Sequence, residues 1–230
     1  MITIVTALFD GRNFGIPHST EIYNASWADK LYRGIKRNTN IPFRMVCLVD
    51  KDYPFEEDIH PIKFYSKNNT VAGWSLLTEM YRPDLSRDWR LTMGLDTIIT
   101  GNIDDYLSPD KDFAMVSDPV FEGDVCNAIT WCSPNSAQLI WDVWVHEPDW
   151  VMQNCKLEPF GIVSEMVLLR KLFNTKNPVP RLDYIYKGVY SYKCHILKYP
   201  KLLESARIVY FHGVPKPHEI RDQELLKHWI

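Results

Sequence analysis

The chain has 230 residues, 46% of them hydrophobic and 13% aromatic, which is enough to build one sizeable core. Its formal net charge is −3 and it has no long run of Lys and Arg, so nucleic acid is not the leading partner. No apolar run reaches about 18 residues, which argues against a membrane-spanning helix. The five cysteines have no CxxC spacing, so reduced thiols and a cytoplasmic location are expected.

Apolar runs of strand length alternate with helix-like segments along the whole chain. The expected strands are residues 2–8, 43–50, 61–65, 88–95, 113–117, 127–132 and 206–213. The expected helices are residues 20–37, 73–81, 136–147 and 161–173. This alternation predicts an α/β fold with a mostly parallel twisted sheet flanked by helices. No internal repeat or low-complexity linker divides the sequence, so a single domain over residues 1–230 is expected.

Polar groups follow several of the expected strands. Asp50 is the last residue of one, Asp96 directly follows another, and His212 lies near the end of the last. In open α/β sheets, ligands bind beyond the carboxyl ends of the strands. Gly213 allows close approach of the backbone, and Lys216 follows between two prolines. A carboxylate with an imidazole suits a divalent ion such as Mn²⁺, and a lysine suits phosphate oxygens. These residues predict a clamp for a metal-bound diphosphate.

Two longer motifs support this interpretation. The stretch "GLDTIITGNIDDYL" at 94–107 matches a strand ending in Asp-x-Asp followed by a Thr-x-x-x-Gly-Asn-Ile-Asp run, apart from its first acid. The stretch "HGVPKP" at 212–217 matches a His-Gly-x-x-Lys-Pro segment, and shorter matching pieces lie at 73–85, 126–131 and 190–193. With these motifs the chain resembles GT-A fold nucleotide-sugar glycosyltransferases of the glycogenin-like and lipopolysaccharide galactosyltransferase (family 8-like) group.

The resemblance implies transfer of a sugar from a nucleoside diphosphate sugar, with UDP as the favoured nucleotide, to a hydroxyl group of a glycan or other acceptor. It implies a divalent metal, Mn²⁺ or Mg²⁺, bound by Asp96 and His212. It also implies that Lys216, with Gly213 beside it, holds the diphosphate. A metal and a lysine placed there would stabilise the charge that develops on the departing nucleoside diphosphate.

By position in that family, the nucleotide lies over the end of the first strand. This implicates Thr6, Ala7 and Phe9, with Asp50 near the base or the ribose. Every first strand ends somewhere, so the same residues also suit a purely structural role.

Three further residues are candidates for the catalytic and acceptor side. Glu165 lies in "GIVSEM" at 161–166, where relatives often carry Gly-Asp-Gln facing the transferred sugar. Asp118 follows the 113–117 strand, and Asn127 begins the 127–132 strand. Asp118 and Asn127 could equally be turn residues.

The chain also departs from the family pattern near the same site. Gly94 stands in place of the first acid of Asp-x-Asp, and Leu77 stands where relatives carry a lysine near the phosphates. These changes leave three possibilities open: a metal held by fewer protein ligands, a metal-independent reaction, or binding without turnover. The third defines the alternative function, a catalytically weakened GT-A-like module that binds a nucleotide or a glycan.

A nucleotidyltransferase is another reading, because such enzymes also place an acid-bound metal on a similar sheet. The stretch "DGRNFG" at 10–15 is the only glycine-containing loop near the N-terminus. It is too short to resemble the Gly-rich loop that wraps a triphosphate, which makes this reading less favourable.

Overall fold

The computed structural model describes residues 1–14, 23–66, 74–174 and 178–230. Residues 20–22 of the first expected helix and Gly73 at the start of the second lie outside the described residues, as does Gly15 of the "DGRNFG" stretch.

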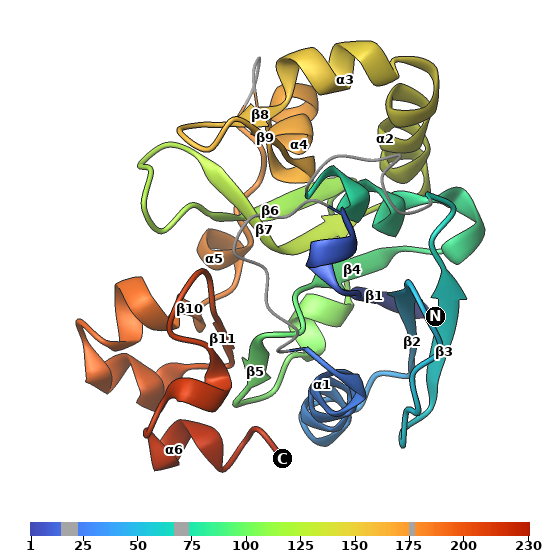
Figure 1. The fold of residues 1–230 in the computed structure, drawn as a ribbon. Coiled ribbons are helices and arrows are strands. Elements are labelled where there is room, and N and C mark those ends of the chain that lie inside the picture. The colour runs from blue at the N-terminus through green and yellow to red at the C-terminus, as the bar shows by residue number, and fades with distance from the viewer. Residues whose placement is uncertain (15–22, 67–73, 175–177) are drawn as a thin grey trace.

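A six-stranded sheet forms the centre of the described fold (Figure 1), with the strand order β3-β2-β1-β4-β7-β6. Its strands are β1 (Ile2–Leu8), β2 (Phe43–Val49), β3 (Ile59–Lys63), β4 (Arg90–Met93), β6 (Phe113–Ser117) and β7 (Val125–Cys132). β3, β2, β1 and β4 pair in parallel, whereas β7 is antiparallel to both of its neighbours. The carboxyl ends of β1, β2, β4 and β6 therefore share one edge of the sheet with the start of β7.

Helices cover both faces of this sheet. α1 (Ala25–Arg37) lies on one face, and α2 (Pro134–His146), α3 (Pro148–Asn154) and α4 (Glu165–Phe173) lie on the other, as Figure 1 shows. Successive residues of β1 point to opposite layers: Ile4 packs in the cluster around α1, and Val5 in the cluster around α2 and α4. This alternation is the period of a β-strand, and it explains why β1 reads as a continuous apolar run.

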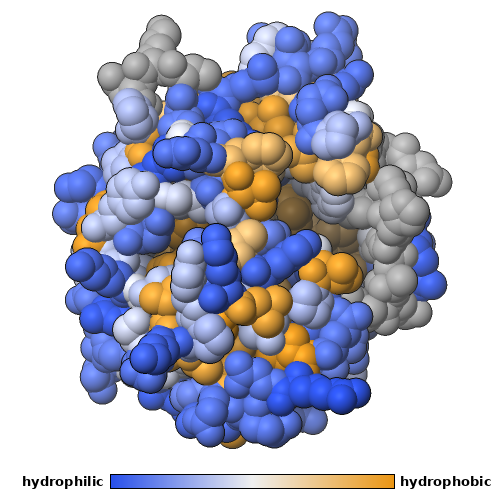
Figure 2. Space-filling model, turned by 90° about the vertical axis from the view of Figure 1, so that its left-hand side faces the viewer, coloured by the Kyte–Doolittle hydropathy of each residue, from blue (hydrophilic) through white to orange (hydrophobic). Residues whose placement is uncertain are grey.

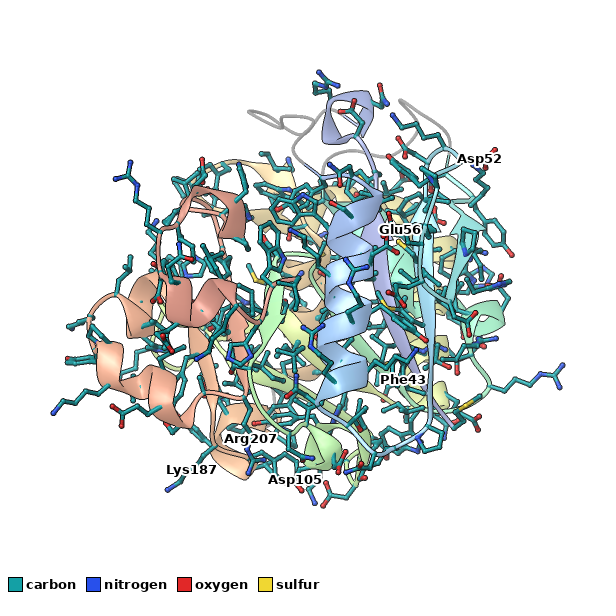
Figure 3. The ribbon with its side chains drawn as sticks, turned by 90° about the horizontal axis from the view of Figure 1, so that it is seen from below. Phe43, Asp52, Glu56, Asp105, Lys187 and Arg207 are labelled. Atoms are coloured by element: carbon teal, nitrogen blue, oxygen red, sulfur yellow. The ribbon has the colours of Figure 1, made fainter. Side chains whose placement is uncertain are left out.

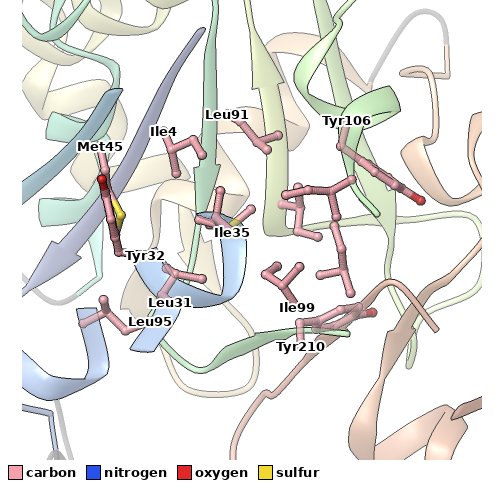
Figure 4. Close-up of a cluster of buried hydrophobic side chains, with 14 of the residues drawn as sticks. Ile4, Leu31, Tyr32, Ile35, Met45, Leu91, Leu95, Ile99, Tyr106 and Tyr210 are labelled. Atoms are coloured by element: carbon pink, nitrogen blue, oxygen red, sulfur yellow. The ribbon is translucent and has the colours of Figure 1, made fainter. Parts of the chain in front are cut away.

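A second, three-stranded sheet lies beside the first. It consists of β10 (Val189–Ser191), β11 (Ile208–Tyr210) and β5 (Thr97–Ile99), in the order β10-β11-β5. Ile99 and Tyr210 join the cluster that contains Leu31 and Ile35 of α1 (Figure 4), so the two sheets share one core. An ion pair of 2.7 Å joins Arg207 to Asp105, and Figure 3 shows these two side chains together at the edge of the molecule.

Short elements complete the described chain. They are α5 (Leu182–Ile185), α6 (Gln223–Leu226), the hairpin of β8 (Lys156–Leu157) with β9 (Ile162–Val163), a π-helical turn over Tyr192–Ile196, and the 3-10 turns Gly11–Phe14, Ser75–Tyr81, Pro83–Leu85, Asp104–Leu107, Pro200–Ser205 and Pro217–Glu219. In these ranges no helix combines the length and hydrophobicity needed to cross a lipid bilayer. All five cysteines are free thiols.

The α/β fold with its mostly parallel central sheet is confirmed, but several boundaries differ from the sequence prediction. The expected helix at 73–81 is a 3-10 helix over Ser75–Tyr81, and the helix expected at 161–173 begins only at Glu165, because β9 occupies Ile162–Val163. The strand expected over 88–95 ends at Met93, so Asp96 lies in the turn that leads into β5. Gly94 has no side chain to continue the strand, which is consistent with that early end.

Candidate active site at the junction of the two sheets

The candidate site lies where the edges of the two sheets meet. Asp96 follows β4 of the large sheet by three residues and immediately precedes β5 of the small sheet. Thr97 pairs with Tyr210, and the backbone N–H of Phe211 donates to the carbonyl oxygen of Asp96 over 3.1 Å. Strand pairing thus brings Asp96 beside the segment that starts at His212. The small sheet is what unites these two distant parts of the chain.

Asp96 is bound directly by Lys216. The Nζ of Lys216 donates to the Oδ2 of Asp96, and the two side chains are only 15% and 14% exposed. The hydroxyl of Tyr23 donates to the same oxygen over 3.0 Å. Burial of Tyr23, followed by the nearby Asp96 charge, raises the pKa of the phenol well above its usual range, so Tyr23 stays protonated and remains a donor. Two donors from different parts of the chain therefore hold one oxygen of this carboxylate.

His212 is held from the other side by the turn that follows β10. Its Nε2 lies 2.9 Å from the Oγ of Ser191 and 3.6 Å from the Sγ of Cys194. Ser191 is fully buried and caps the π-helical turn, accepting the N–H of Cys194 over 3.1 Å. Burial is the main reason why the pKa of His212 lies below its usual value, and the charge of Lys193 comes next. His212 is therefore mostly neutral at pH 7, the form that can bind a metal ion.

Glu165, which is buried, and Asn127, which is partly buried, are joined by a hydrogen bond. The Nδ2 of Asn127 donates to the Oε2 of Glu165, and the hydroxyl of Tyr81 donates to its Oε1 over 2.9 Å. Glu165 is 1% exposed, and burial raises the pKa of its carboxyl to about 7, although both hydrogen bonds act in the opposite direction. A carboxyl group with such a pKa can hold or release a proton near neutral pH, as an acid–base group must. Burial to this degree also suits a structural role.

Asp118 makes contacts that stabilise a turn. Its Oδ1 accepts the backbone N–H groups of Val120 and Phe121 over 2.8 and 2.9 Å, and its Oδ2 accepts Arg170 over 2.6 Å. The structure therefore gives Asp118 the turn-forming role that its sequence context also allowed. A groove of about 580 Å³ opens beside it, and its lining includes Val120, Glu122, Asp124, Arg181, Tyr184 and His195. Figure 2 shows the face of the molecule that lies over the C-terminal elements, with hydrophobic residues through its middle, hydrophilic residues around them and a hollow to the upper right of its centre.

The four residues that were predicted to bind the nucleotide lie at or near the ends of β1 and β2, and they differ in how far they are exposed to solvent. Thr6 is 1% exposed, and its Oγ1 has no hydrogen-bond partner among the described residues. Ala7 is half-buried, and Phe9 packs edge-on against Phe64 with 5.6 Å between the ring centroids. Asp50 accepts the hydroxyl of Tyr53 over 2.9 Å and the N–H of Asp10 over 3.2 Å. Asp50 is thus oriented by its neighbours, whereas Thr6 faces the interior.

The donor set for a metal ion is small. In the described part of the chain, no three His, Cys, Asp or Glu side chains are grouped so that they could hold an ion. A Cβ on Gly94 would lie only 2.8 Å from the Oδ1 of Asp96, so this carboxylate extends into space that any side chain at position 94 would need. Leu77 packs against a hydrophobic cluster. With Gly94 and Leu77 at these positions, Asp96 and His212 are the two predicted metal ligands that remain.

Four residues of the site were not predicted from the sequence as functional. They are Tyr23, which binds Asp96; Tyr81, which binds Glu165; and Ser191 and Lys193 beside His212. The sequence did contain a signal for three of them, because Tyr81 lies in the matching piece at 73–85 and Ser191 and Lys193 lie in the "YSYK" piece at 190–193. Tyr23 lies on a segment whose position relative to Asp96 depends on the tertiary fold, so its residue type alone could not identify it.

Solved structures of glycosyltransferases share the fold of this chain. The apo structure of the bifunctional glycosyltransferase WbbM matches 94% of this chain with a TM-score of 0.60 and 15% identity. The glycosyltransferase GlyE of Streptococcus pneumoniae TIGR4 matches 97% with a TM-score of 0.60 and 13% identity. The galactosyltransferase LgtC, solved in complex with donor and acceptor sugar analogs, matches 97% with a TM-score of 0.61 and 11% identity.

These likenesses establish the fold. The chain spans 46% of the WbbM chain and 59% of the GlyE chain, about half the length of each, but 91% of the LgtC chain. No protein-family model matches the sequence, and no curated protein is similar to it.

Proposed function

We propose that this protein is a glycosyltransferase that transfers a sugar from a nucleoside diphosphate sugar, with UDP as the nucleotide, to a hydroxyl group of an acceptor. One observation carries the proposal: Asp96 and Lys216, 120 positions apart, meet at the edge where the parallel strands end. The shared fold with three glycosyltransferases supports it, because LgtC binds donor and acceptor sugar analogs in a structure that this chain matches over nearly its whole length.

In this proposal the reaction breaks the bond between the anomeric carbon and the diphosphate oxygen, and negative charge develops on the leaving diphosphate. Lys216 stabilises that charge, and Gly213, with a φ of +61°, keeps the adjoining backbone free of a side chain. The anomeric carbon bonds to the acceptor oxygen, whose proton is lost. Asp50 orients the base or ribose, beside the backbone of Thr6, Ala7 and Phe9.

The residues present fit a divalent ion only in part. A carboxylate and a neutral imidazole are suitable ligands for Mn²⁺ or Mg²⁺, and such ions commonly use one or two protein ligands together with phosphate oxygens and water. We propose Asp96 and His212 as these ligands. An ion would have to compete with Lys216 for Asp96 and with Ser191 for the Nε2 of His212. When bound, the ion would neutralise charge on the leaving diphosphate.

We propose that the transferred sugar lies near Glu165 and that the acceptor lies beside Asp118. Glu165, held by Asn127 and Tyr81, has a pKa near 7 because of burial, and we propose it as the carboxyl group nearest the sugar. The acceptor would enter through the groove beside Asp118, where an exposed aromatic ring, Tyr184, can pack against a sugar face. The cytoplasmic location stays a prediction that agrees with the free thiols.

The test is release of UDP from a panel of UDP-sugars, with and without Mn²⁺, by the wild-type protein and by Asp96→Asn. Turnover above the Asp96→Asn background is the expected result. A titration of UDP under the same four conditions tests the metal separately. If the wild type and Asp96→Asn bound UDP equally well with and without Mn²⁺, the metal assignment would be wrong.

A second function is favoured by specific observations. Gly94 in place of an acid, Leu77 in a hydrophobic cluster and Lys216 on the remaining acid all reduce the number of groups available to a metal. They favour a module that binds a nucleotide or glycan without turnover. UDP binding without UDP release from any donor, in the presence of sugar acceptors, would identify this module.

A further inference from the structure

One charged side chain near His212 has no ion-pair partner among the described residues. The charges that act on the His212 ring include those of Lys193, Asp118, Lys216 and Asp96. Asp96 is paired with Lys216, and Asp118 is paired with Arg170 over 2.6 Å. Lys193 is the fourth, and the part of the chain that the structure describes offers it no carboxylate. One unpaired ammonium group therefore faces the candidate site.

The Nζ of Lys193 lies close to the backbone of Gly213, in the loop that joins His212 to Lys216. A Cβ placed on Gly213 would lie 4.0 Å from the Nζ of Lys193, and, apart from Gly213 and its two neighbours in the chain, no other heavy atom of the described residues lies within that distance. Gly213 follows His212 directly and adopts a φ of +61°. The ammonium group thus lies over the loop backbone, on the same loop that leads to Lys216.

The turn that carries Lys193 is tied to the site. Its N-cap, Ser191, contacts the Nε2 of His212, and the backbone N–H of Ser191 donates to the Nδ1 of His195 over 3.0 Å. The side chain of Lys193 is exposed, but its backbone is fixed two residues from a fully buried serine. The base of Lys193 is therefore held in position relative to His212, while its ammonium group can reach a ligand.

We propose that Lys193 is a second diphosphate-binding residue, which acts together with Lys216; this inference rests on the proposed function. An unpaired cation next to a glycine loop attracts an anion, and a lysine ammonium binds phosphate oxygens as a compact point charge. Lys216 already donates to Asp96, whereas Lys193 has no carboxylate partner among the described residues and is therefore available to the diphosphate. Leu77 packs against a hydrophobic cluster and brings no charge to the site, whereas Lys193 supplies a positive charge from the turn over Tyr192–Ile196.

The test compares UDP, uridine and inorganic pyrophosphate by calorimetric titration against the wild type and three variants. Lys193→Gln removes the charge, Lys193→Arg keeps it, and Lys198→Gln is the matched control. Lys198 is also exposed on the same segment, but its Nζ lies over the ring of Tyr199, 5.3 Å from the centroid. All titrations are first made without added metal and at two salt concentrations.

Lys193→Gln should weaken UDP and pyrophosphate about tenfold, equal to about 1.4 kcal/mol, and leave uridine unchanged. It should also reduce the salt dependence of UDP binding, while Lys193→Arg and Lys198→Gln stay close to wild type. Equal binding by the wild type and Lys193→Gln would overturn the inference and leave the proposed function standing. If the wild-type protein bound pyrophosphate but not UDP, the nucleotide part of the proposed function would fail instead. Binding of neither ligand would overturn both.

Discussion

The Nζ of Lys216 donates to the Oδ2 of Asp96, so an acid from the first half of the chain pairs with a base near its C-terminal end. Pairing of β5 with β11 creates this contact, because it sets Thr97 opposite Tyr210. A partly buried ion pair needs both partners: removal of one leaves a charge that solvent cannot fully hydrate. The pair therefore links the stability of the small sheet to the charge of the candidate site.

Replacement of Lys216 by methionine should weaken UDP binding tenfold or more, because it removes one cation and leaves Asp96 to repel the diphosphate. Uridine binding should change little. The matched control is Lys227→Met, which removes a lysine that pairs with Glu224 on the surface. Parallel titrations with UDP and uridine measure both effects, and an equal loss for the two ligands would contradict a phosphate contact.

Gly94 should be essential for the position of the Asp96 carboxylate. A Cβ at position 94 would lie 2.8 Å from the Oδ1 of Asp96, so Gly94→Ala should displace that carboxylate from Lys216 and Tyr23. We expect a loss of about 1 kcal/mol in the free energy of unfolding, of the size usual for such local contacts.

A double-mutant cycle isolates this effect. In an Asp96→Ala background the added methyl group meets no carboxylate, so Gly94→Ala should cost clearly less than in the wild type. Denaturant titrations of the four proteins provide the measurement. The same cost in both backgrounds would show that Gly94 is needed for backbone reasons alone.

Glu165 should make stability depend on pH in a defined window. Its pKa is about 7 in the folded protein, whereas the ordinary value for a glutamate is 4.5, so between these values the folded state keeps a proton that the unfolded state releases. The free energy of unfolding should therefore fall as pH rises from about 4.5 to about 7, by on the order of 3 kcal/mol. Glu165→Gln, which has similar volume and no charge, should lose this part of the pH dependence. Unfolding curves at pH 5 and pH 8 suffice, and parallel profiles for the two proteins would refute the assignment.

The C-terminal residues should contribute to stability through the first helix. Trp229 packs edge-on against Trp27 of α1 with 5.0 Å between ring centroids, and the Nζ of Lys30 lies 3.7 Å from the Trp229 ring. Trp229→Ala should cost about 1–3 kcal/mol, less than for a fully buried tryptophan. Ile230→Ala, at a position that is 58% exposed, is the control. A melting temperature of Trp229→Ala equal to that of the control would show that this packing adds nothing.

The sequence predicted the elements whose signal is local. β1 and β6 have the predicted bounds, since each is a buried apolar run. The three-residue strands β5 and β10 were missed because they are too short to show a period. The reversed direction of β7 could not be predicted either, since alternation of side chains is the same in parallel and antiparallel strands.

In the site, too, the sequence predicted some features and could not predict those that depend on the tertiary fold. The convergence of Asp96 with the segment after the last strand followed from the rule that ligands collect at strand ends. The direct contact between Asp96 and Lys216 did not, because side-chain pairing depends on register. Lys193 lies in the matching "YSYK" piece, but its residue type gave no specific role, since a lysine on a polar segment is usually solvated. The turn capped by Ser191 and the open backbone at Gly213 show where its ammonium group lies.

The junction of the two sheets also has a consequence for how the protein is made. Asp96 leaves the ribosome well before Lys216, and β5 has no β11 to pair with until residue 210 has been synthesised. At translation rates of about 5–20 residues per second, the large sheet can form several seconds before the small one. During that interval the nascent chain carries the carboxylate of Asp96 without Lys216, the lysine that we propose to bind the diphosphate, so nucleotide affinity is expected to arise late in biosynthesis.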